Sequence, residues 1–412
     1  MIYYSSMQKV KMIKGGICSA KGFRAAGVPA GIKYAGRNDV ALIVADAPCA
    51  AAAVFTTNQV AAAPVLYDRA IVRGGRVQAI LANSGCANAC TGEEGFKDAK
   101  LSALVTAGEL GIDPRHVLVA STGVIGRRLP MDRLLAGLKA AVPALGRTDA
   151  HALAANQAVM TTDTKTKQAA ARVTIGGKTV TVGGMAKGSG MIEPNMATML
   201  GFVTTDAAIS PAMLRRALGL ALNRSFNRVV VDGDESTNDS LFLLASGQAG
   251  NAPISRAGAD FDAFLAALTA VCVSLAQQMA ADGEGATKFV TVTVKGAKSA
   301  KDAERAARAV AKSPLAKTSW FGKDPNWGRV LAAVGYSGAA ADDTKAEVFY
   351  GREWACRRGR IADEQQLAKL AKVLEADAFT VTVDLHLGTG EATIYTCDFS
   401  LDYVHINADY TT

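Results

Sequence analysis

The sequence predicts an α/β (α+β) protein, because short apolar runs alternate with longer segments of helical periodicity. In the first half of the chain, runs of β-branched or apolar residues occupy 40–44, 79–81 and 117–120. Apolar residues with helical spacing occupy 98–110 and 131–141. Short strands separated by amphipathic helices are typical of sheets covered by helices.

The middle and the end of the chain continue this alternation. Segments 171–175 and 179–182 flank a Gly-Gly-Lys turn and predict a hairpin that leads into the glycine-rich loop 183–190. A strand at 199–204 is followed by Ser210 and Pro211, a capping pair that predicts a helix to about 222. Further strands are expected at 228–231, 241–245, 289–294, 379–387 and 392–397, and further helices at 261–281, 301–312 and 363–374.

Composition indicates a globular protein and narrows its partners. The 412 residues are 50% hydrophobic and 20% charged, enough for one large or two medium domains. The 45 Lys and Arg exceed the 37 Asp and Glu, but the excess is scattered, so we expect no nucleic acid partner. A basic surface instead favours small anionic substrates.

Cysteine usage and hydropathy predict the compartment. Seven cysteines at irregular spacing form no disulfide framework, and Cys86 and Cys90 lack the further ligands of a zinc site. The first residues have no signal-peptide pattern, and no stretch is expected to reach the length needed to cross a bilayer. We therefore expect a cytoplasmic protein without a membrane partner.

Thr198 follows small, flexible residues and directly precedes an apolar run. A cut between Ala197 and Thr198 would give one residue both a hydroxyl nucleophile and a free α-amine to act as its base. The reference pKa of that amine, about 7.7 to 8.0, leaves a useful neutral fraction near physiological pH. The alternative is that Thr198 simply begins a strand, and the chemistry alone does not decide between the two.

The acidic run 232–239 has the alternating oxygen spacing that begins a calcium loop, but it fails that motif. Thr237 replaces the glycine of the turn, and Leu243 occupies the position of the bidentate glutamate. We expect structural hydrogen bonding near the core and no metal site. The glycine-rich loop 183–190 likewise lacks the residue order of a phosphate-binding or dinucleotide-binding loop.

The segment MAKGSGMIEPNMATMLGFVTTD at 185–206 resembles the self-cleaving segment of the ornithine acetyltransferases, the ArgJ family of arginine biosynthesis. The resemblance extends along essentially the whole chain, in order. It includes KGFRAAGV at 21–28, ANSGCANACTG at 82–92, STGVIG at 121–126, MTTDT at 160–164, DGDESTND at 232–239, DGEGATK at 282–288, DPNWGR at 324–329 and INADYTT at 406–412. Glu193 departs from the Ala or His expected beside the cut, which bears on the rate of cleavage.

The resemblance implies a self-processed ArgJ/DmpA-like fold of mixed β-sheets layered with helices. Autocatalytic cleavage at Ala197–Thr198 would give an alpha chain, 1–197, and a beta chain, 198–412, which carries the C-terminal substrate contacts. The mature enzyme would be a glutamate N-acetyltransferase that moves acetyl from N2-acetyl-L-ornithine to L-glutamate, giving L-ornithine and N-acetyl-L-glutamate. The acetyl group would pass through an acetyl-threonine in a ping-pong reaction.

The resemblance also implies the site residues. Thr198 would be the nucleophile, and Thr122 and Gly123 the oxyanion hole. The substrate contacts would be Thr161, Lys187, Thr198, Glu284, Asn407 and Thr412. No metal or organic cofactor is implied, and acetyl-CoA as a second donor is left open. The expected assembly is a heterotetramer of two alpha and two beta chains.

Two other functions remain open at this point. An N-terminal-nucleophile amidohydrolase or aminopeptidase would use the same Thr198 but pass the acyl group to water. An amino-acid-binding protein would keep an uncut chain and form no acetyl-enzyme.

Overall fold

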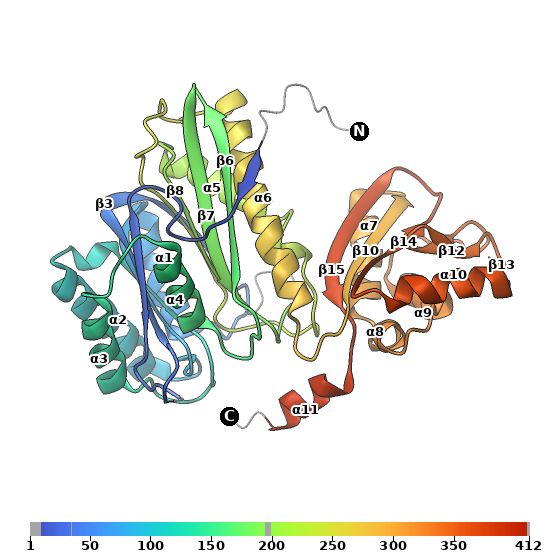
Figure 1. Cartoon of the computed structure of the whole chain (residues 1–412), viewed down its shortest axis with the longest axis horizontal. Helices are drawn as coiled ribbons and strands as arrows, with labels where there is room; N and C mark the ends of the chain where they lie inside the picture. Colours follow the sequence, from blue (N-terminus) through green and yellow to red (C-terminus); the bar gives the residue numbers. More distant parts are fainter. Residues whose placement is uncertain (1–9, 34, 194–198, 410–412) are drawn as a thin grey trace.

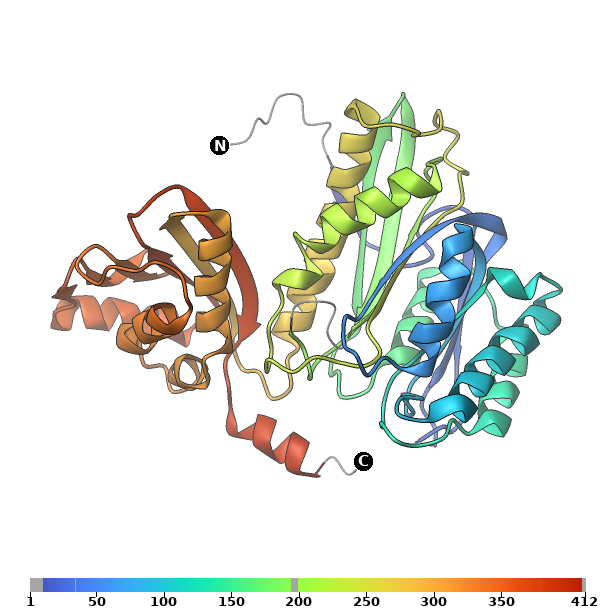
Figure 2. The same cartoon turned by 180° about the vertical axis from the view of Figure 1, so that it is seen from behind.

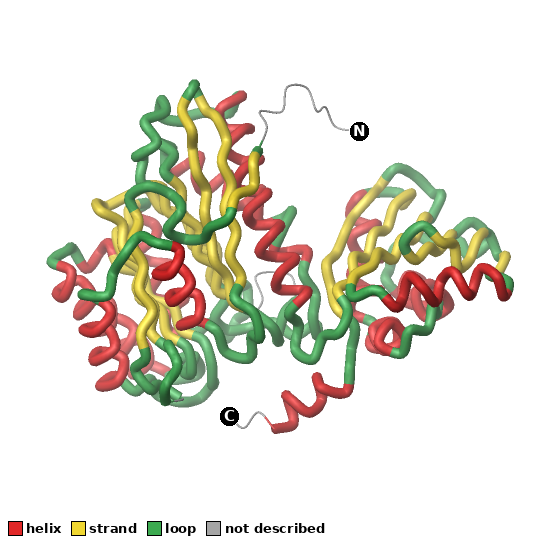
Figure 3. The backbone as a smooth tube through the Cα atoms, in the orientation of Figure 1, coloured by secondary structure: helices red, strands yellow, loops and turns green. Residues whose placement is uncertain are grey.

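The computed structural model describes residues 10–33, 35–193 and 199–409, which form two β-sheets with separate sets of helices (Figures 1 and 3). The strands of the larger sheet are β1 (Lys11–Ile13), β2 (Phe23–Val28), β3 (Val40–Phe55), β4 (Arg76–Asn83), β5 (Val117–Ser121), β6 (Lys167–Ile175), β7 (Lys178–Lys187), β8 (Leu200–Thr205) and β9 (Ser240–Ala245). Their order is β1-β6-β7-β8-β9-β3-β4-β5, with β2 paired to β3. The β4–β5 and β8–β9 pairs are parallel and the other pairs are antiparallel.

Helices cover both faces of the larger sheet. They are α1 (Ala63–Ile71), α2 (Gly92–Leu110), α3 (Met131–Ala141), α4 (Asp149–Val159), α5 (Pro211–Leu222) and α6 (Ala259–Ala281). Side chains of β9 alternate between the faces: Leu241 and Leu243 join the core of α5 and α6, whereas Phe242 joins the core of α4. Figure 2 shows α1–α3 and α5–α6 on the same side of the sheet, opposite α4.

The smaller sheet lies in the C-terminal part. Its strands are β10 (Phe289–Ala297), β11 (Glu347–Tyr350), β12 (Glu353–Arg357), β13 (Arg360–Ile361), β14 (Ala378–Asp384) and β15 (Gly390–Cys397), in the order β13-β12-β11-β14-β10-β15. The remaining helices are α7 (Ala300–Lys312), α8 (Pro314–Phe321), α9 (Trp327–Tyr336), α10 (Glu364–Glu375) and α11 (Leu401–Asp409), with 3₁₀ turns at η1 (Val72–Gly74), η2 (Pro114–His116) and η3 (Phe226–Arg228). Helix α11 leaves the smaller sheet and runs back toward the larger one (Figure 1).

The predicted α/β fold of mixed sheets layered with helices is confirmed. The hairpin is present as β6 and β7, and its turn needs the positive φ angles of Gly176 and Gly177, 54° and 73°. The predicted pair of C-terminal strands is also present as β14 and β15. They do not pair with each other, because β10 lies between them.

The prediction of a strand at 228–231 is wrong. The segment begins with the 3₁₀ turn η3 and then makes a single bridge, in which the Val230 N–H donates to the Tyr395 carbonyl at 2.9 Å. Its apolar residues are buried because they link the core of α6 to the smaller sheet, not because they belong to a ladder.

The expectation that no segment has the length and composition to cross a bilayer is also wrong. Helix α6 has 23 residues and a mean hydropathy of 1.7 in its most apolar window. Half of that window is buried inside the fold, where Phe264, Leu268 and Leu275 are buried in the core over the larger sheet. Its apolar character is therefore accounted for by the core position of α6.

The predicted cut at Ala197–Thr198 falls in the connection between β7 and β8. Strand β8 pairs with β7 on one side and β9 on the other, so a cut there would leave both chains in one sheet. The proposed division into 1–197 and 198–412 is thus a division of the chain and stays a prediction. The two sheets divide later, between α6 and β10.

Candidate active site

Every predicted site residue in the described parts of the chain lines one cavity of about 130 Å³. These residues are Thr122, Gly123, Thr161, Lys187, Glu284 and Asn407. They come from the loop after β5, the loop after α4, the end of β7, the loop after α6 and from α11. Ala197, Thr198 and Thr412 lie outside the described residues.

The loop after β5 is shaped by Gly123, whose φ is +131°. A Cβ atom at this position would lie 2.4 Å from the Gly85 carbonyl carbon, so only glycine fits against the neighbouring loop. The Thr122 N–H donates to the Asn83 carbonyl at 3.0 Å, which continues the contact between β5 and β4. Thr122 and Gly123 are therefore presented to the cavity by a fixed backbone.

Lys187 orients the Thr122 side chain. Its Nζ donates to Thr122 Oγ1 at 3.3 Å, and because a hydroxyl has a single hydrogen, Thr122 keeps that hydrogen for another acceptor. Lys187 is 2% exposed. Burial lowers its pKa from the usual value, while the negative charge of Asp163 opposes that shift.

A buried ion-pair cluster joins three of the segments that line the cavity. Lys167 Nζ lies 2.7 Å from Asp163 Oδ1 and 2.5 Å from Asp282 Oδ2, and all three side chains are at most 4% exposed. Burial alone would raise the pKa of Asp163, but the ammonium groups of Lys187 and Lys167 hold it at about 2. Asp163 is therefore ionised at neutral pH.

The two carboxylates of this cluster also bind backbone. Asp163 accepts from the N–H groups of Thr161, at 3.1 Å, and Gly188, at 2.7 Å. Asp282 accepts from the N–H groups of Thr164 and Lys165 at 3.1 and 3.2 Å. The loop after α4, the end of β7 and the loop after α6 are therefore held together beneath the cavity.

Glu284 and Asn407 bring the C-terminal part of the chain into the site. The Glu284 N–H donates to the Ser189 carbonyl at 2.9 Å, and its Oε2 accepts from Asn407 Nδ2 at 2.8 Å. A Cβ atom at Gly190 would lie 2.3 Å from the Glu284 carboxyl, so this glycine makes room for that side chain. Helix α11 therefore reaches the cavity through the side chain of Asn407, one of the predicted substrate contacts.

The acidic run 232–239 anchors both flanks of segment 194–198. Asp232 accepts from the N–H groups of Met191 and Ile192 at 2.5 and 2.8 Å. Asp239 Oδ1 accepts from the Met199 N–H at 2.7 Å. Asp239 is fully buried, which raises its pKa well above the usual value. The structural hydrogen bonding expected of this run is present, at the edges of the predicted cleavage segment.

The sequence predicted no role for Asp163 or Lys167, and for Asp239 only the structural hydrogen bonding expected of its run. Asp163 lies in MTTDT and Asp239 in DGDESTND, two of the motifs that carry the family resemblance, and this is the sequence feature that could have pointed to them. Lys167 carries no such signal, because its partner Asp282 is 115 residues away. Within the described ranges, no group of three or more His, Cys, Asp or Glu side chains could hold a metal ion.

The arrangement suits a small zwitterionic ligand. An ammonium group, a carboxylate, a side-chain amide and hydroxyl groups face one cavity, beside a rigid Thr-Gly turn. Such a set can pair with both charges of an amino acid and can donate hydrogen bonds to a carbonyl oxygen.

Comparison with known proteins gives matches along the chain. The family model described as the ArgJ family matches residues 24–412. The arginine biosynthesis bifunctional protein ArgJ of Symbiobacterium thermophilum is 53% identical over 409 residues, covering 98% of this chain and 100% of the relative. The protein of the same name from Geobacter sulfurreducens is 51% identical over 394 residues, covering 96% and 100%. A solved structure of ornithine acetyltransferase complexed with ornithine, from Mycobacterium tuberculosis, is 42% identical and covers 47% of this chain and 100% of that chain, with a TM-score of 0.43.

The buried cluster predicts a large stability effect. Lys167→Met leaves two carboxylates buried without their cation, so we expect the free energy of unfolding to fall by about 3–5 kcal/mol. Urea unfolding followed by circular dichroism measures this loss. Lys165→Met, two residues away on an exposed side chain, is the matched control and should change little. Equal stability of the two variants would contradict the structural role of the cluster.

Proposed function

The chain belongs to the ArgJ family and is an acetyltransferase of arginine biosynthesis, and we propose that the cavity described above is where it transfers acetyl from N2-acetyl-L-ornithine to L-glutamate. The chain first cuts itself between Ala197 and Thr198, and Thr198 then serves as the nucleophile. The observation that supports this proposal most directly is that the six described residues of the predicted site, from five separate segments, line one cavity.

The position of Thr198 in the chain supports the proposal. Leu200 pairs with Lys187 in the β7–β8 register, so the chain enters β8 beside the strand end that carries Lys187. Met199 is held by Asp239, and Thr198 is the residue bonded to it. The residue that directly follows Thr198 is therefore anchored at the start of β8, beside the strand end that carries Lys187.

In the first half-reaction, Thr198 Oγ forms a bond to the acetyl carbonyl carbon while the α-amine of Thr198 accepts the hydroxyl proton. The Thr122 hydroxyl and the Gly123 N–H stabilise the negative charge that develops on the carbonyl oxygen. Lys187 favours the role of Thr122 as a donor. The Thr122 hydroxyl accepts a hydrogen bond from Lys187 Nζ, so its own hydrogen is left to donate to the carbonyl oxygen. The C–N bond then breaks, and the leaving amine of ornithine takes the proton from the α-ammonium.

In the second half-reaction, the amine of L-glutamate attacks the acetyl-threonine ester. Its proton passes through the α-amine to Thr198 Oγ as the ester bond breaks, which regenerates the enzyme and releases N-acetyl-L-glutamate. Lys187 pairs with the substrate α-carboxylate and Glu284 with the ornithine ammonium, and Thr161 and Asn407 supply hydrogen bonds. Thr412, outside the described residues, belongs to the same proposed set.

The proposed reaction needs no metal or organic cofactor, since nucleophile and base both come from Thr198. We also propose acetyl-CoA as an additional donor to glutamate, since both relatives compared above are named bifunctional proteins. The two chains stay together because β8 of the second chain lies between β7 of the first chain and β9. We propose two copies of each chain in the assembly, and action in the reducing cytoplasm, which fits seven free cysteines.

Replacing the nucleophile tests self-cleavage. Thr198→Ala removes the hydroxyl, so we expect one full-length polypeptide without transferase activity, whereas wild-type protein gives two fragments that meet at 197/198. Denaturing mass spectrometry measures the chains. Thr198→Ser, which keeps a hydroxyl, should retain part of the cleavage. Cleavage of the alanine variant at the same bond would contradict the assignment.

Replacing the oxyanion donor tests the role of Thr122. Thr122→Val removes the hydroxyl at nearly constant volume, and we expect kcat to fall by about 10²–10³-fold with a small change in KM. Steady-state kinetics with N-acetylornithine and glutamate measure both constants on cleaved protein. Thr122→Ser restores the donor and should recover most of the rate. A fall confined to KM would instead indicate a binding role.

A further inference from the structure

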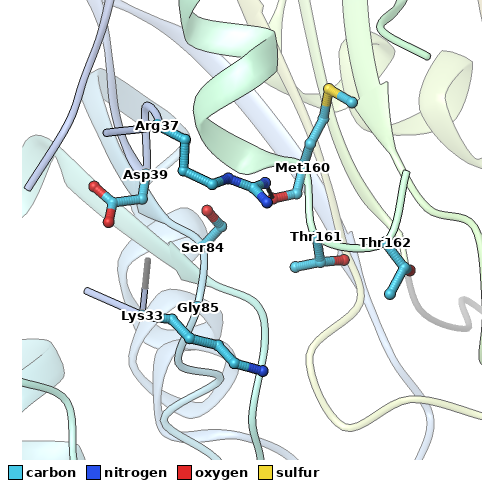
Figure 4. Close-up of a pocket in the computed structure, with 8 residues that line it drawn as sticks. All are labelled: Lys33, Arg37, Asp39, Ser84, Gly85, Met160, Thr161 and Thr162. Atoms are coloured by element: carbon cyan, nitrogen blue, oxygen red, sulfur yellow. Dashed lines mark hydrogen bonds between the residues drawn. The ribbon is translucent and has the colours of Figure 1, made fainter. Parts of the chain in front are cut away.

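A second cavity, of about 330 Å³, shares part of its lining with the proposed acetyl-transfer cavity. Figure 4 shows the residues that line this second cavity. Thr161 and Thr162 line both cavities, so the two spaces meet at this short loop. Lys33 and Arg37 lie in the wall of the second cavity, together with Asp39 and Ser84. The mechanism above uses none of these four side chains.

The charges of this wall favour an anion. Arg37 Nη2 donates to the Met160 carbonyl at 2.6 Å, which holds the guanidinium against the loop that continues to Thr161. The carboxylate of Asp39 accepts from the backbone N–H groups of Ala30 and Ile32, both at 2.6 Å. Figure 4 shows this carboxylate pointing away from the ends of both cationic side chains. The wall therefore carries two positively charged side chains, and its negative charge is directed into the backbone of 30–32.

The two amino acids of the proposed reaction make opposite demands on the enzyme. The side chain of ornithine ends in an ammonium group and that of glutamate in a carboxylate. Glu284 suits the first and repels the second, because like charges at close range destabilise each other by several kcal/mol. A site that serves both amino acids therefore needs a separate positive wall within reach of the same acetyl group.

We infer that Lys33 and Arg37 form the subsite for the side-chain carboxylate of the acceptor, L-glutamate. Its α-amine faces the acetyl-threonine in the first cavity, and its side chain passes the Thr161–Thr162 loop into the second. A glutamate side chain is short, so this subsite has to adjoin the first cavity. The lining that the two cavities share at Thr161 and Thr162 meets this condition. The inference rests on the proposed transfer to glutamate and adds the residues that select this acceptor.

Acceptor selectivity tests the subsite. L-Glutamine has nearly the same shape as glutamate but no charge, so wild-type protein should prefer glutamate. Lys33→Gln should lower kcat/KM for glutamate about tenfold, the size expected for loss of one charge-assisted contact, and leave glutamine nearly unchanged. Lys33→Arg keeps the charge and should keep the preference. Arg37 is a weaker test position, because it also supports the Met160 carbonyl.

A control separates a local contact from the general field of a basic protein. Lys301→Gln removes one exposed positive charge from α7, in the smaller sheet unit, and should not alter the preference for glutamate. An unchanged preference in Lys33→Gln would overturn the inference. A rise in KM for acetyl-CoA with unaltered glutamate preference would also overturn it, and would assign the cavity to phosphate groups. If wild-type protein makes no N-acetylglutamate from N-acetylornithine, the proposed function itself fails.

Discussion

The cavity depends on the ammonium group of Lys167, buried between the carboxylates of Asp163 and Asp282. Each carboxylate also accepts from backbone N–H groups, so the ion pairs fix loops and not only side chains. The negative charge of Asp163 further stabilises the buried ammonium of Lys187, whose pKa burial alone would lower more. One desolvated cluster therefore sets both the shape of the site and its electrostatics. Removing one charged partner from this buried cluster would cost several kcal/mol, because the remaining charge would be left without compensation.

The sheet and the acidic run make a cut between β7 and β8 compatible with an intact site. Strand β8 pairs with β7 from Val182–Thr205 to Lys187–Leu200, so its position does not depend on the connecting peptide. Asp232 and Asp239 hold the residues on either side of segment 194–198. A new chain start at Thr198 would leave these contacts in place, and the second chain would still carry Glu284 and Asn407 to the cavity.

Local sequence patterns predicted much of the fold. Six residues named from the motif resemblance line one cavity, and their catalytic and binding roles stay predictions. Helix α3 matched its predicted bounds because its apolar spacing and its packing agree. The strand predicted at 228–231 failed because burial there comes from linking two cores, which a short apolar run does not distinguish from a ladder. Lys167 and Asp282 could not be paired in advance, since their contact depends on the position of α6 over β6 and β7.

The acetyl-enzyme is the intermediate on which the proposed mechanism depends, and its mass can be measured directly. Wild-type protein is mixed with N-acetylornithine in the absence of glutamate, and the chains are weighed by intact mass spectrometry. We expect the chain beginning at Thr198 to gain one acetyl group as ornithine is released, and added glutamate to remove this group as N-acetylglutamate. Ornithine release that requires glutamate, or acetyl loss to water at the same rate with and without glutamate, would contradict this mechanism.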